Sequence, residues 1–428
     1  MNLVLLSGGN PYDGSSGLVY DMYKSFKDKG HSVVLITNYY DIKFEPGIKS
    51  VYGKYASIMH IWSTKIRNKL ARKTNPNYYM ISLHENHNYI RTKKVLNHIN
   101  FKVDAFLYLF PHHFLNSRNL YELNQDTGAP IFVMPMDMAN FTGGCHYANN
   151  CEGYKHSCGI CPGIYSQKQK DITYKNIIYK KKYISKTNVY TLGNQWSSEH
   201  IKQSSIYKDK PNFNLNILIN ESIFKPGDNN EARKIFNIPI YKKIILFAAA
   251  SVREKRKGLS YLMDSLNILH KEISKAEGEK IGIAIAGNIE TEILQSIPFD
   301  TYLLGYLNSK TELPLAYQMA DVFVSPSIQD AGPMMVVQSM MCGTPVIAFE
   351  MGNAFDYIID GETGYKVPLY DTIILKEKII SLLQLPKEEK HKMSIKCREI
   401  GLSKSSSDMF EKKFISIFKT TKNNPNQN

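Results

Sequence analysis

The sequence predicts an α/β protein built from two doubly wound, Rossmann-like domains. Apolar strands at Leu3–Leu6 and Lys243–Ala248 each lead into a loop, a helix and a further strand, and this alternation continues along both halves. Such alternation favours parallel sheets with right-handed crossovers. The length of 428 residues is too great for one ordinary core and suits two domains of roughly 200 residues.

The first domain is expected at residues 1–215. Its opening strand is followed by a glycine-rich turn, and helical spacing then runs from Leu18 to Lys29, where Gly30 ends the helix. The remaining apolar strands of this domain are expected at Ser32–Thr37, Ala105–Phe110, Ile131–Met134 and Asn188–Leu192.

The second domain is expected at residues 216–402, after a stretch from Pro211 to Pro226 in which the periodicity lapses. Residues 403–428 are expected to form a helix that packs back on the first domain, followed by a frayed tail. Ligands of such sheets bind at the carboxyl ends of the strands, so we expect a central cleft that both domains face. The expected strands and helices are Gly258–His270, Ile281–Ala286, Thr301–Leu304, Leu313–Met319, Val322–Ser325, Met334–Met341 and Val346–Phe349.

The composition is that of a globular protein with an excess of positive charge. The formal net charge is +14, which fits anionic partners such as phosphorylated substrates, lipid headgroups or nucleic acid. The sequence contains no window of 18 or more apolar residues, so a membrane-spanning helix is not expected. Met1–Gly8 lacks the basic region of a signal peptide. We therefore expect a cytoplasmic protein.

Residues 325–356 hold the most specific pattern. The strand ending at Ser325 is followed by Asp330-Ala331-Gly332-Pro333 and a helix, then by Gly343-Thr344-Pro345 and another strand. Gly332 lets the backbone approach a ligand closely. The backbone N–H groups of a helix start suit a phosphate or a sugar. The candidate ligand contacts in this loop and first turn are Gly332, Pro333, Met334 and Met335.

This segment resembles the retaining GT-B glycosyltransferases of family 4, which carry Glu-x7-Glu between a Pro-Ser pair and a Gly-x-Pro-Val-Ile strand. The resemblance implies that Asp330 contacts the donor sugar near the reacting carbon and that Gln338 binds the ribose hydroxyls. Both residues replace a glutamate of the family pattern. Asp is one methylene shorter, and Gln carries no charge. The structural alternative is a helix N-cap at Asp330 and a surface residue at Gln338.

The run Arg253-Glu254-Lys255-Arg256-Lys257-Gly258 supports the same resemblance. Cations after a buried strand would stabilise the charge that develops on a nucleotide diphosphate leaving group. The resemblance implies a catalytic role for Lys257 with Arg253 or Arg256 as its partner, in place of a catalytic metal. It also places the nucleotide base against Gly305 and Tyr306. A solvated basic loop is the alternative.

The first domain carries further motifs of this resemblance. Gly14, Ser15, Ser16 and Gly17 lie where the family covers the donor phosphates. The motifs at residues 83–87 and 136–147 are similar to those of a bacterial subgroup that builds exopolysaccharide and O-antigen repeats. They imply acceptor-side roles for His84 and His87 and a catalytic role for Asp137, with Met136 replacing the subgroup's His. The alternative is that these polar side chains lie at strand ends and only make hydrogen bonds within the protein.

Four cysteines fall within a short insertion at residues 141–165. Four thiolates of such a cluster could form a tetrahedral structural zinc site, with His146 and His156 as possible substitutes. Two disulfides or four free thiols are the alternatives. The four candidate ligands are Cys145, Cys151, Cys158 and Cys161. Cys342 and Cys397 are expected to be ordinary buried residues.

Residues 51–104 contain ten basic and two acidic residues, together with an apolar stripe at helical spacing. Such a basic amphipathic helix fits a contact with an anionic membrane. The alternative is a solvated helix whose apolar side faces the core. Lys175 and Lys180–Lys182 would extend the same basic surface. The stripe consists of Ile58, Ile61, Trp62, Ile66 and Leu70.

The favoured function is transfer of a sugar, with retention, from a UDP- or GDP-sugar to a hydroxyl of a lipid-linked glycan at the inner face of the plasma membrane. Two other enzyme activities on the same fold stay open, a nucleotide-sugar epimerase and a hydrolase. A basic binding protein is a third candidate, but no nucleic-acid recognition motif is present. A catalytically inactive scaffold is a fourth, because Met136, Asp330 and Gln338 depart from the family pattern.

Overall fold

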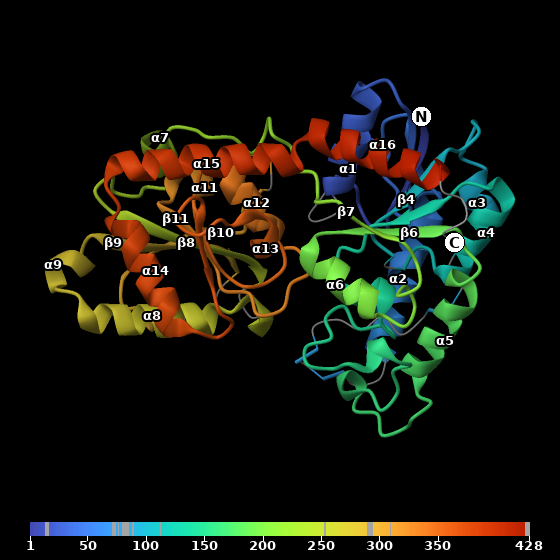
Figure 1. The fold of residues 1–428 in the computed structure, drawn as a ribbon, viewed down its shortest axis with the longest axis horizontal. Helices are drawn as coiled ribbons and strands as arrows, with labels where there is room; N and C mark the ends of the chain where they lie inside the picture. Colours follow the sequence, from blue (N-terminus) through green and yellow to red (C-terminus); the bar gives the residue numbers. More distant parts are fainter. Residues whose placement is uncertain are drawn as a thin grey trace. The chain divides into compact units, whose positions relative to one another are not determined.

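The computed structural model describes residues 1–12, 17–70, 74–75, 77–78, 85–87, 90–111, 113–251, 254–288, 294–308 and 310–423. The chain divides into two compact units (Figure 1). The first consists of residues 1–218 and 411–428, and the second of residues 219–410. Each unit holds one parallel sheet, which confirms the predicted class of two doubly wound α/β domains.

The sheet of the first unit has the order β3-β2-β1-β4-β5-β6-β7 among the described residues. Leu3 of the central strand pairs in parallel with Val33 on one side and Ala105 on the other. The strand order therefore reverses between β1 and β4, and ligands of such sheets bind at the carboxyl ends of these strands. The strands are β1 (Asn2–Leu6), β2 (Ser32–Thr37), β3 (Ile48–Ser50), β4 (Ala105–Tyr108), β5 (Ile131–Val133), β6 (Val189–Gly193) and β7 (Asn212–Asn214).

Local sequence explains where several helices of this unit begin and end. Asn116 and Asn119 form a reciprocal capping box at the start of α4, and Gly128 ends that helix with φ 70°. Asp171 caps α5 by accepting from two backbone N–H groups. The helices are α1 (Gly17–Asp28), α2 (Lys54–Leu70), α3 (Thr92–Leu96), α4 (Ser117–Thr127), α5 (Ile172–Ile184), α6 (Gln195–Gln203) and α16 (Ser407–Asn423), with short 3-10 turns η2 (Met138–Phe141), η3 (Gly153–Lys155) and η4 (Pro162–Ile164).

The sheet of the second unit has the order β10-β9-β8-β11-β12-β13. Its order reverses between β8 and β11, where Val322 pairs in parallel with Ile245. This reversal defines the second edge at which a ligand is expected. The strands are β8 (Lys243–Ser251), β9 (Ile281–Asn288), β10 (Asp300–Gly305), β11 (Val322–Ser325), β12 (Val346–Phe349) and β13 (Gly364–Val367).

The helices of the second unit bury a core that includes Tyr317, Phe323 and Phe349. Cys342 and Cys397 are buried as predicted. The described helices are α7 (Asn229–Ile235), η5 (Lys255–Lys257), α8 (Leu259–Glu272), α9 (Lys275–Gly278), α11 (Glu312–Met319), α12 (Met334–Met341), α13 (Ala354–Tyr357), α14 (Thr372–Gln384) and α15 (Lys387–Ser405). Within the described residues, no helix is long and apolar enough to cross a bilayer.

Candidate functional site

In the second unit, the loops after β8 and β11 bring three predicted site residues together. The Nζ of Lys257 lies 2.5 Å from Oδ2 of Asp330, and Nη1 of Arg256 lies 3.1 Å from the same oxygen. The Asp330 side chain is only 7% exposed. Burial alone would raise the pKa of this carboxyl, but the two cations outweigh burial and hold the pKa below its ordinary value. The site therefore contains a charged, buried carboxylate.

Close backbone contact fixes the loop that carries these cations. Gly258 has φ +76°, and a Cβ atom there would lie 1.7 Å from the carbonyl oxygen of Pro326, so only glycine fits. The backbone N–H of Ile328 donates to the carbonyl of Arg256 at 2.8 Å. Glu254 adds a second carboxylate on Arg256 at 2.7 Å. The Lys-Gly pair predicted from the sequence thus sits at a tight junction of two loops.

The start of α12 is fixed from a third loop. A Cβ atom on Gly352, which has φ +53°, would lie 2.7 Å from the carbonyl oxygen of Asp330. The buried Asn353 donates to the carbonyl of Pro333 at 3.2 Å. The N-cap of α12 is Pro333, so Asp330 is not the N-cap of the structural alternative. Half-buried positions at this turn that a ligand could reach are Gly332, Met334 and Met335.

Gln338 lies on α12 with 8% of its surface exposed, so it is not a surface residue. Its Oε1 accepts a hydrogen bond from the buried hydroxyl of Tyr317 at 3.2 Å. This contact fixes the orientation of the amide and turns its oxygen toward Tyr317. The oxygen of this amide is therefore engaged within the protein.

Gly305 ends β10 and Tyr306 follows it, two strands away from β8 in the sheet. Gly305 has φ +67°, and the Tyr306 side chain is 63% exposed. An exposed aromatic ring at the carboxyl end of a strand offers a surface on which a base can stack. Arg253, the other candidate for the arginine role, lies outside the described residues.

In the first unit, hydrogen bonds join the turn after β1 to the residues that follow β2 and β4. The N–H of Gly8 donates to the carbonyl of Phe110 at 2.8 Å. Gly9 donates to Oδ1 of Asn38 at 2.8 Å and accepts from Thr37 at 2.6 Å. Gly17 is buried at the start of α1. The candidate residues Gly14, Ser15 and Ser16 lie outside the described residues.

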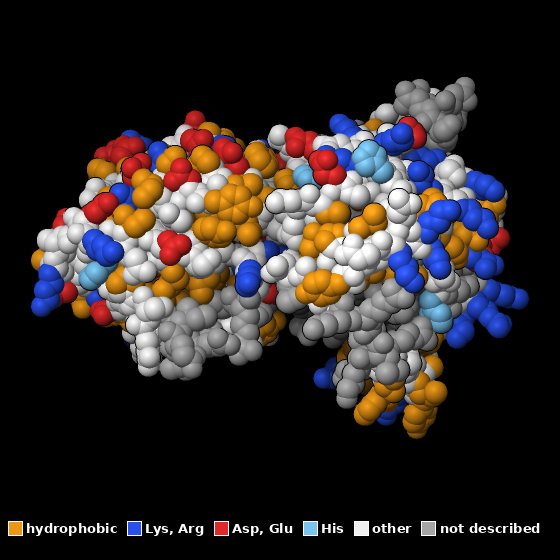
Figure 2. All heavy atoms as spheres, turned by 90° about the horizontal axis from the view of Figure 1, so that it is seen from below, with side chains coloured by type: hydrophobic (Ala, Val, Ile, Leu, Met, Phe, Trp, Pro, Cys, Tyr) orange, Lys and Arg blue, Asp and Glu red, His pale blue; other side chains and the backbone are white. Residues whose placement is uncertain are grey.

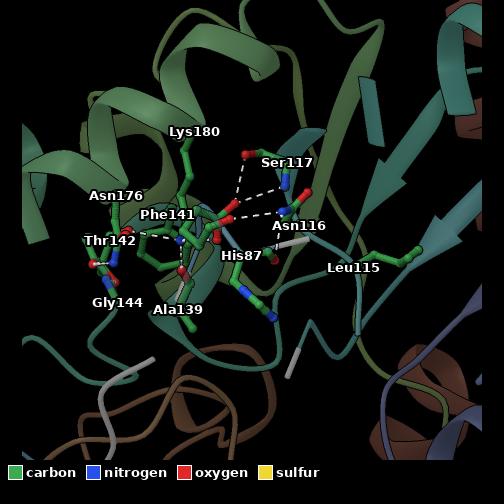
Figure 3. Close-up of polar contacts among 12 residues, drawn as sticks. His87, Leu115, Asn116, Ser117, Ala139, Phe141, Thr142, Gly144, Asn176 and Lys180 are labelled. Atoms are coloured by element: carbon green, nitrogen blue, oxygen red, sulfur yellow. Dashed lines mark hydrogen bonds and ion pairs between the residues drawn. The ribbon is translucent and has the colours of Figure 1, made fainter. Parts of the chain in front are cut away.

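A buried lysine organises the loops that carry the acceptor-side candidates. Figure 3 shows Lys180 extending from α5 toward Ala139 and Thr142. Its Nζ donates to these two carbonyls at 2.5 Å and 3.1 Å and lies 3.6 Å from Oε2 of Glu85. Lys180 is only 8% exposed at its side chain. The prediction that it extends a basic surface was wrong, because its charge is used inside the unit.

Glu85 connects this lysine to the start of α4. Its Oε1 accepts from the N–H and the hydroxyl of Ser117 at 2.9 Å and 2.7 Å. The Asn116 amide donates to the carbonyls of Glu85 and His87 at 3.0 Å and 3.2 Å. His87 is thus held by its backbone while its residue surface is exposed. His84 lies outside the described residues.

Asp137 pairs with His146 rather than standing alone. Its Oδ2 lies 2.7 Å from Nδ1 of His146, and its Oδ1 accepts from the N–H of Ala139 at 2.7 Å. The His146 side chain is 7% exposed and that of Asp137 is 20% exposed. The sequence indicated His146 only as a substitute zinc ligand, because its nine-residue separation from Asp137 gave no sign of this pair.

The four clustered cysteines line one small cavity of about 20 Å³, together with Tyr78 and Tyr154. All four are free thiols, so the structure forms neither of the disulfides considered from the sequence. Burial raises the pKa of Cys145 to about 12. Among the described residues, no group of three or more His, Cys, Asp or Glu side chains is arranged to hold a metal ion. Zinc binding therefore stays a prediction.

The apolar stripe on α2 faces solvent. Ile58, Trp62 and Ile66 are 46%, 65% and 53% exposed, which excludes the core-facing alternative for these residues. The neighbouring Tyr55 and Met59 are also exposed. Figure 2 shows exposed hydrophobic side chains grouped on a projecting part of the surface, with Lys and Arg side chains gathered on the same half of the molecule. The side chains of Ile61 and Leu70 lie outside the described residues.

Residues 228–399 match the sequence model of the family described as glycosyl transferases group 1. D-inositol 3-phosphate glycosyltransferase of Corynebacterium diphtheriae is 25% identical over 175 residues, which are 38% of this chain and 40% of that protein. Phosphatidyl-myo-inositol mannosyltransferase of Mycobacterium leprae is 28% identical over 161 residues, 36% of this chain and 41% of that protein. The chain therefore spans about two fifths of the length of these relatives.

Two solved structures share the fold over nearly the whole chain. Sucrose-phosphate synthase of Thermosynechococcus elongatus aligns with a TM-score of 0.67 and 14% identity, covering 98% of both chains. HepE of Anabaena, in complex with UDP and glucose, aligns with a TM-score of 0.61 and 12% identity, covering 98% of this chain and 99% of that one. The predicted GT-B fold, with its two Rossmann-like units, is confirmed.

Proposed function

We propose that this chain, whose residues 228–399 match the group 1 glycosyltransferases, moves a sugar from a nucleotide diphosphate sugar to a hydroxyl group. The observation that carries the proposal is the position of Lys257 and Arg256, which pair with Asp330 at the β8–β11 reversal of the sheet. Breaking the bond to a diphosphate leaving group develops negative charge, and preorganised cations stabilise it. No catalytic metal is needed in this scheme.

The other residues of the second unit have roles in the same proposal. Backbone and side chains of residues 332–335 contact the donor, the exposed ring of Tyr306 stacks against the base, and the NH₂ group of Gln338 donates to a ribose oxygen. The base is uracil or guanine. Retention of configuration is supported by the resemblance of residues 325–356 to a retaining family.

The first unit supplies the acceptor side in this proposal. His87 is exposed on a loop held by Asn116, and Asp137 is held by the loop that Lys180 anchors. Both loops belong to one buried hydrogen-bond network (Figure 3). We place a glycan hydroxyl near His87 and the Asp137–His146 pair, with Asp137 in the catalytic role.

A thermal-shift screen tests donor binding directly. UDP, GDP and their sugars are added to the wild-type protein, to Lys257→Ala and to Lys390→Ala. Lys390 is a matched control because it too pairs with a carboxylate, that of Asp321. Asp321 precedes β11, whereas Asp330, the partner of Lys257, follows it. One base series is expected to raise the Tm of wild type and Lys390→Ala but not of Lys257→Ala. Equal shifts for all three proteins would remove Lys257 from the site.

The acceptor is proposed to be a lipid-linked glycan of cell-surface polysaccharide synthesis, of the exopolysaccharide or O-antigen kind, reached at the inner face of the plasma membrane. The support is the exposed stripe of α2, since apolar side chains beside basic ones suit an anionic bilayer surface. Three residues of the stripe, Ile58, Trp62 and Ile66, are exposed together with the neighbouring Tyr55 and Met59.

Tryptophan fluorescence can test this contact, because Trp62 is exposed and the second tryptophan, Trp196, is buried. Vesicles containing anionic lipids are expected to shift the emission to shorter wavelength and to bind the protein. Trp62→Ser combined with Ile66→Ser removes the reporter, so its binding is followed by co-sedimentation with the vesicles and should be abolished. The control combines Ile240→Ser with Tyr241→Ser, two similarly exposed apolar residues of the second unit, and should bind normally. Binding that survives loss of the α2 pair would contradict the proposal.

A further inference from the structure

The cations proposed to bind the donor already share an anion in the protein. Asp330 Oδ2 lies within 3.1 Å of both Lys257 Nζ and Arg256 Nη1. Glu254 lies 2.7 Å from Arg256 as well. These two cations and two carboxylates cancel in formal charge. Both cations are therefore paired with carboxylates of the protein itself.

The geometry indicates whether Asp330 or Lys257 can move apart from the other. Asp330 has a short side chain, and its carbonyl lies against Gly352, where even a Cβ atom would be too close. Its Oδ1 also accepts from the N–H of Gly332 at 3.4 Å. Lys257 is a long side chain that is 18% exposed, so it can swing while Asp330 stays. Of the two partners, Lys257 therefore has the room to move and Asp330 does not.

We infer that Asp330 is a placeholder anion, which holds Lys257 and Arg256 in position until the diphosphate of the donor takes them over. Asp330 is then a positioning residue that acts through the cations. The resemblance noted from the sequence implies instead a direct contact with the donor sugar. The inference rests on the proposed function, since it assigns the displacing ligand as a diphosphate. It predicts that the Asp330 charge opposes diphosphate binding.

Calorimetric titration of UDP, GDP and inorganic pyrophosphate tests the inference. In Asp330→Asn, a unit negative charge a few ångströms from the diphosphate is gone, so the Kd is expected to fall about tenfold after screening by solvent is allowed for. Asp330→Glu keeps the charge and should bind within about threefold of wild type. Glu254→Gln, which removes the second carboxylate on Arg256, should lower the Kd by about threefold and serves if Asp330→Asn does not fold.

Asp321→Asn is the matched control. Asp321 also pairs with one arginine and one lysine, Arg233 at 2.8 Å and Lys390 at 3.1 Å, but it precedes β11 whereas Asp330 follows it. Its replacement should lower the Tm and leave the Kd unchanged. A tighter Kd in Asp330→Asn but not in Asp321→Asn supports the inference, whereas an unchanged or weaker Kd overturns it.

The pyrophosphate titration distinguishes failure of this inference from failure of the proposed function. If wild type binds pyrophosphate but neither nucleotide, and Asp330→Asn binds pyrophosphate more tightly, the inference stands and the proposed donor falls. If wild type binds UDP or GDP and Asp330→Asn binds it no better, the proposed function stands and the inference falls. If wild type and Asp330→Asn bind none of the three anions, both fall.

Discussion

Burial disfavours the charged form of Asp330. Two cations at hydrogen-bonding distance outweigh burial and keep the carboxylate charged. Replacing one partner of such a buried cluster leaves the others without compensation, which costs stability. The carboxylate therefore contributes to the fold of the second unit whatever its role toward a ligand. The direction of its pKa shift gives this contribution a pH dependence.

The pKa of Asp330 lies below its ordinary value of 3.8 in the folded protein. A depressed pKa adds stability that is present above the unfolded value and is lost as pH falls through the folded value. The stability advantage of wild type over Asp330→Asn should hold at neutral pH and shrink below about pH 4. Urea unfolding of both proteins from neutral to acidic pH measures it. A difference that does not change across this range would contradict the assigned charge.

Helix α5 organises the loops of the first unit through Lys180. The helix also contributes Asn176, whose amide donates to the carbonyl of Gly143 at 2.9 Å. Ser204 of a different segment donates to the carbonyl of Phe141 at 2.7 Å. Side chains from outside the loop thus satisfy several carbonyls of residues 139–143. A loop held in this way depends on a few buried side chains.

Replacing Lys180 with Met should destabilise the first unit. The substitution keeps the apolar stem but leaves the half-buried Glu85 without its cation and two carbonyls without their donor, a loss of about 3 kcal/mol. Lys175→Met is the control on the same helix, because Lys175 is exposed and should cost little. Urea unfolding followed by tryptophan fluorescence reports on this unit, which contains both tryptophans. Equal stability of the two variants would show that the buried contacts contribute nothing.

The sequence predicts the elements whose ends are marked by proline or glycine. The helix predicted at Met334–Met341 is observed with those bounds, because Pro333 precedes it and Gly343 follows it. The edge strands β3 and β7 were missed, since three residues such as Ile48-Lys49-Ser50 carry no apolar run. Lys180 was misplaced for a related reason. A lysine in a lysine-rich helix gives no local sign that it is buried.

The chain returns to its first unit at residues 411–428. Phe414 of α16 packs edge-on against Phe26 and Phe132, with ring centroids 5.6 Å and 5.2 Å apart. Glu411 pairs with His31 at 2.8 Å. Both aromatic partners on the first unit are fully buried. The first unit is therefore completed by residues that follow the second unit in the sequence.

Truncation after Phe410 should destabilise the first unit and promote aggregation, because it uncovers the rings of Phe26 and Phe132. Truncation after Asn423 is the control, since it keeps all of α16 that the structure describes. Differential scanning calorimetry and light scattering compare the two proteins. Equal Tm and equal solubility would show that α16 is dispensable.

The fold class was predictable because strand and helix patterns alternate throughout both halves, and the solved structures of the same fold confirm it. The candidate site was predictable in its residue types after β8 and β11. Its arrangement was not, because contacts such as Asp330 with Lys257 or Asp137 with His146 depend on how loops meet. Gly258 shows the difference: the sequence marks a glycine, and only the structure shows the carbonyl of Pro326 that requires it.

The most direct test of the proposed glycosyl transfer uses the UDP- or GDP-sugar that the binding screen identifies and lipid-linked acceptors. Product formation and the anomeric configuration of the new bond are followed by NMR for wild type, Lys257→Ala and Lys390→Ala. We expect a glycoside of retained configuration with wild type and Lys390→Ala, and a rate at least about a thousandfold lower with Lys257→Ala. Donor consumption without an acceptor, or near-normal transfer by Lys257→Ala, would contradict it.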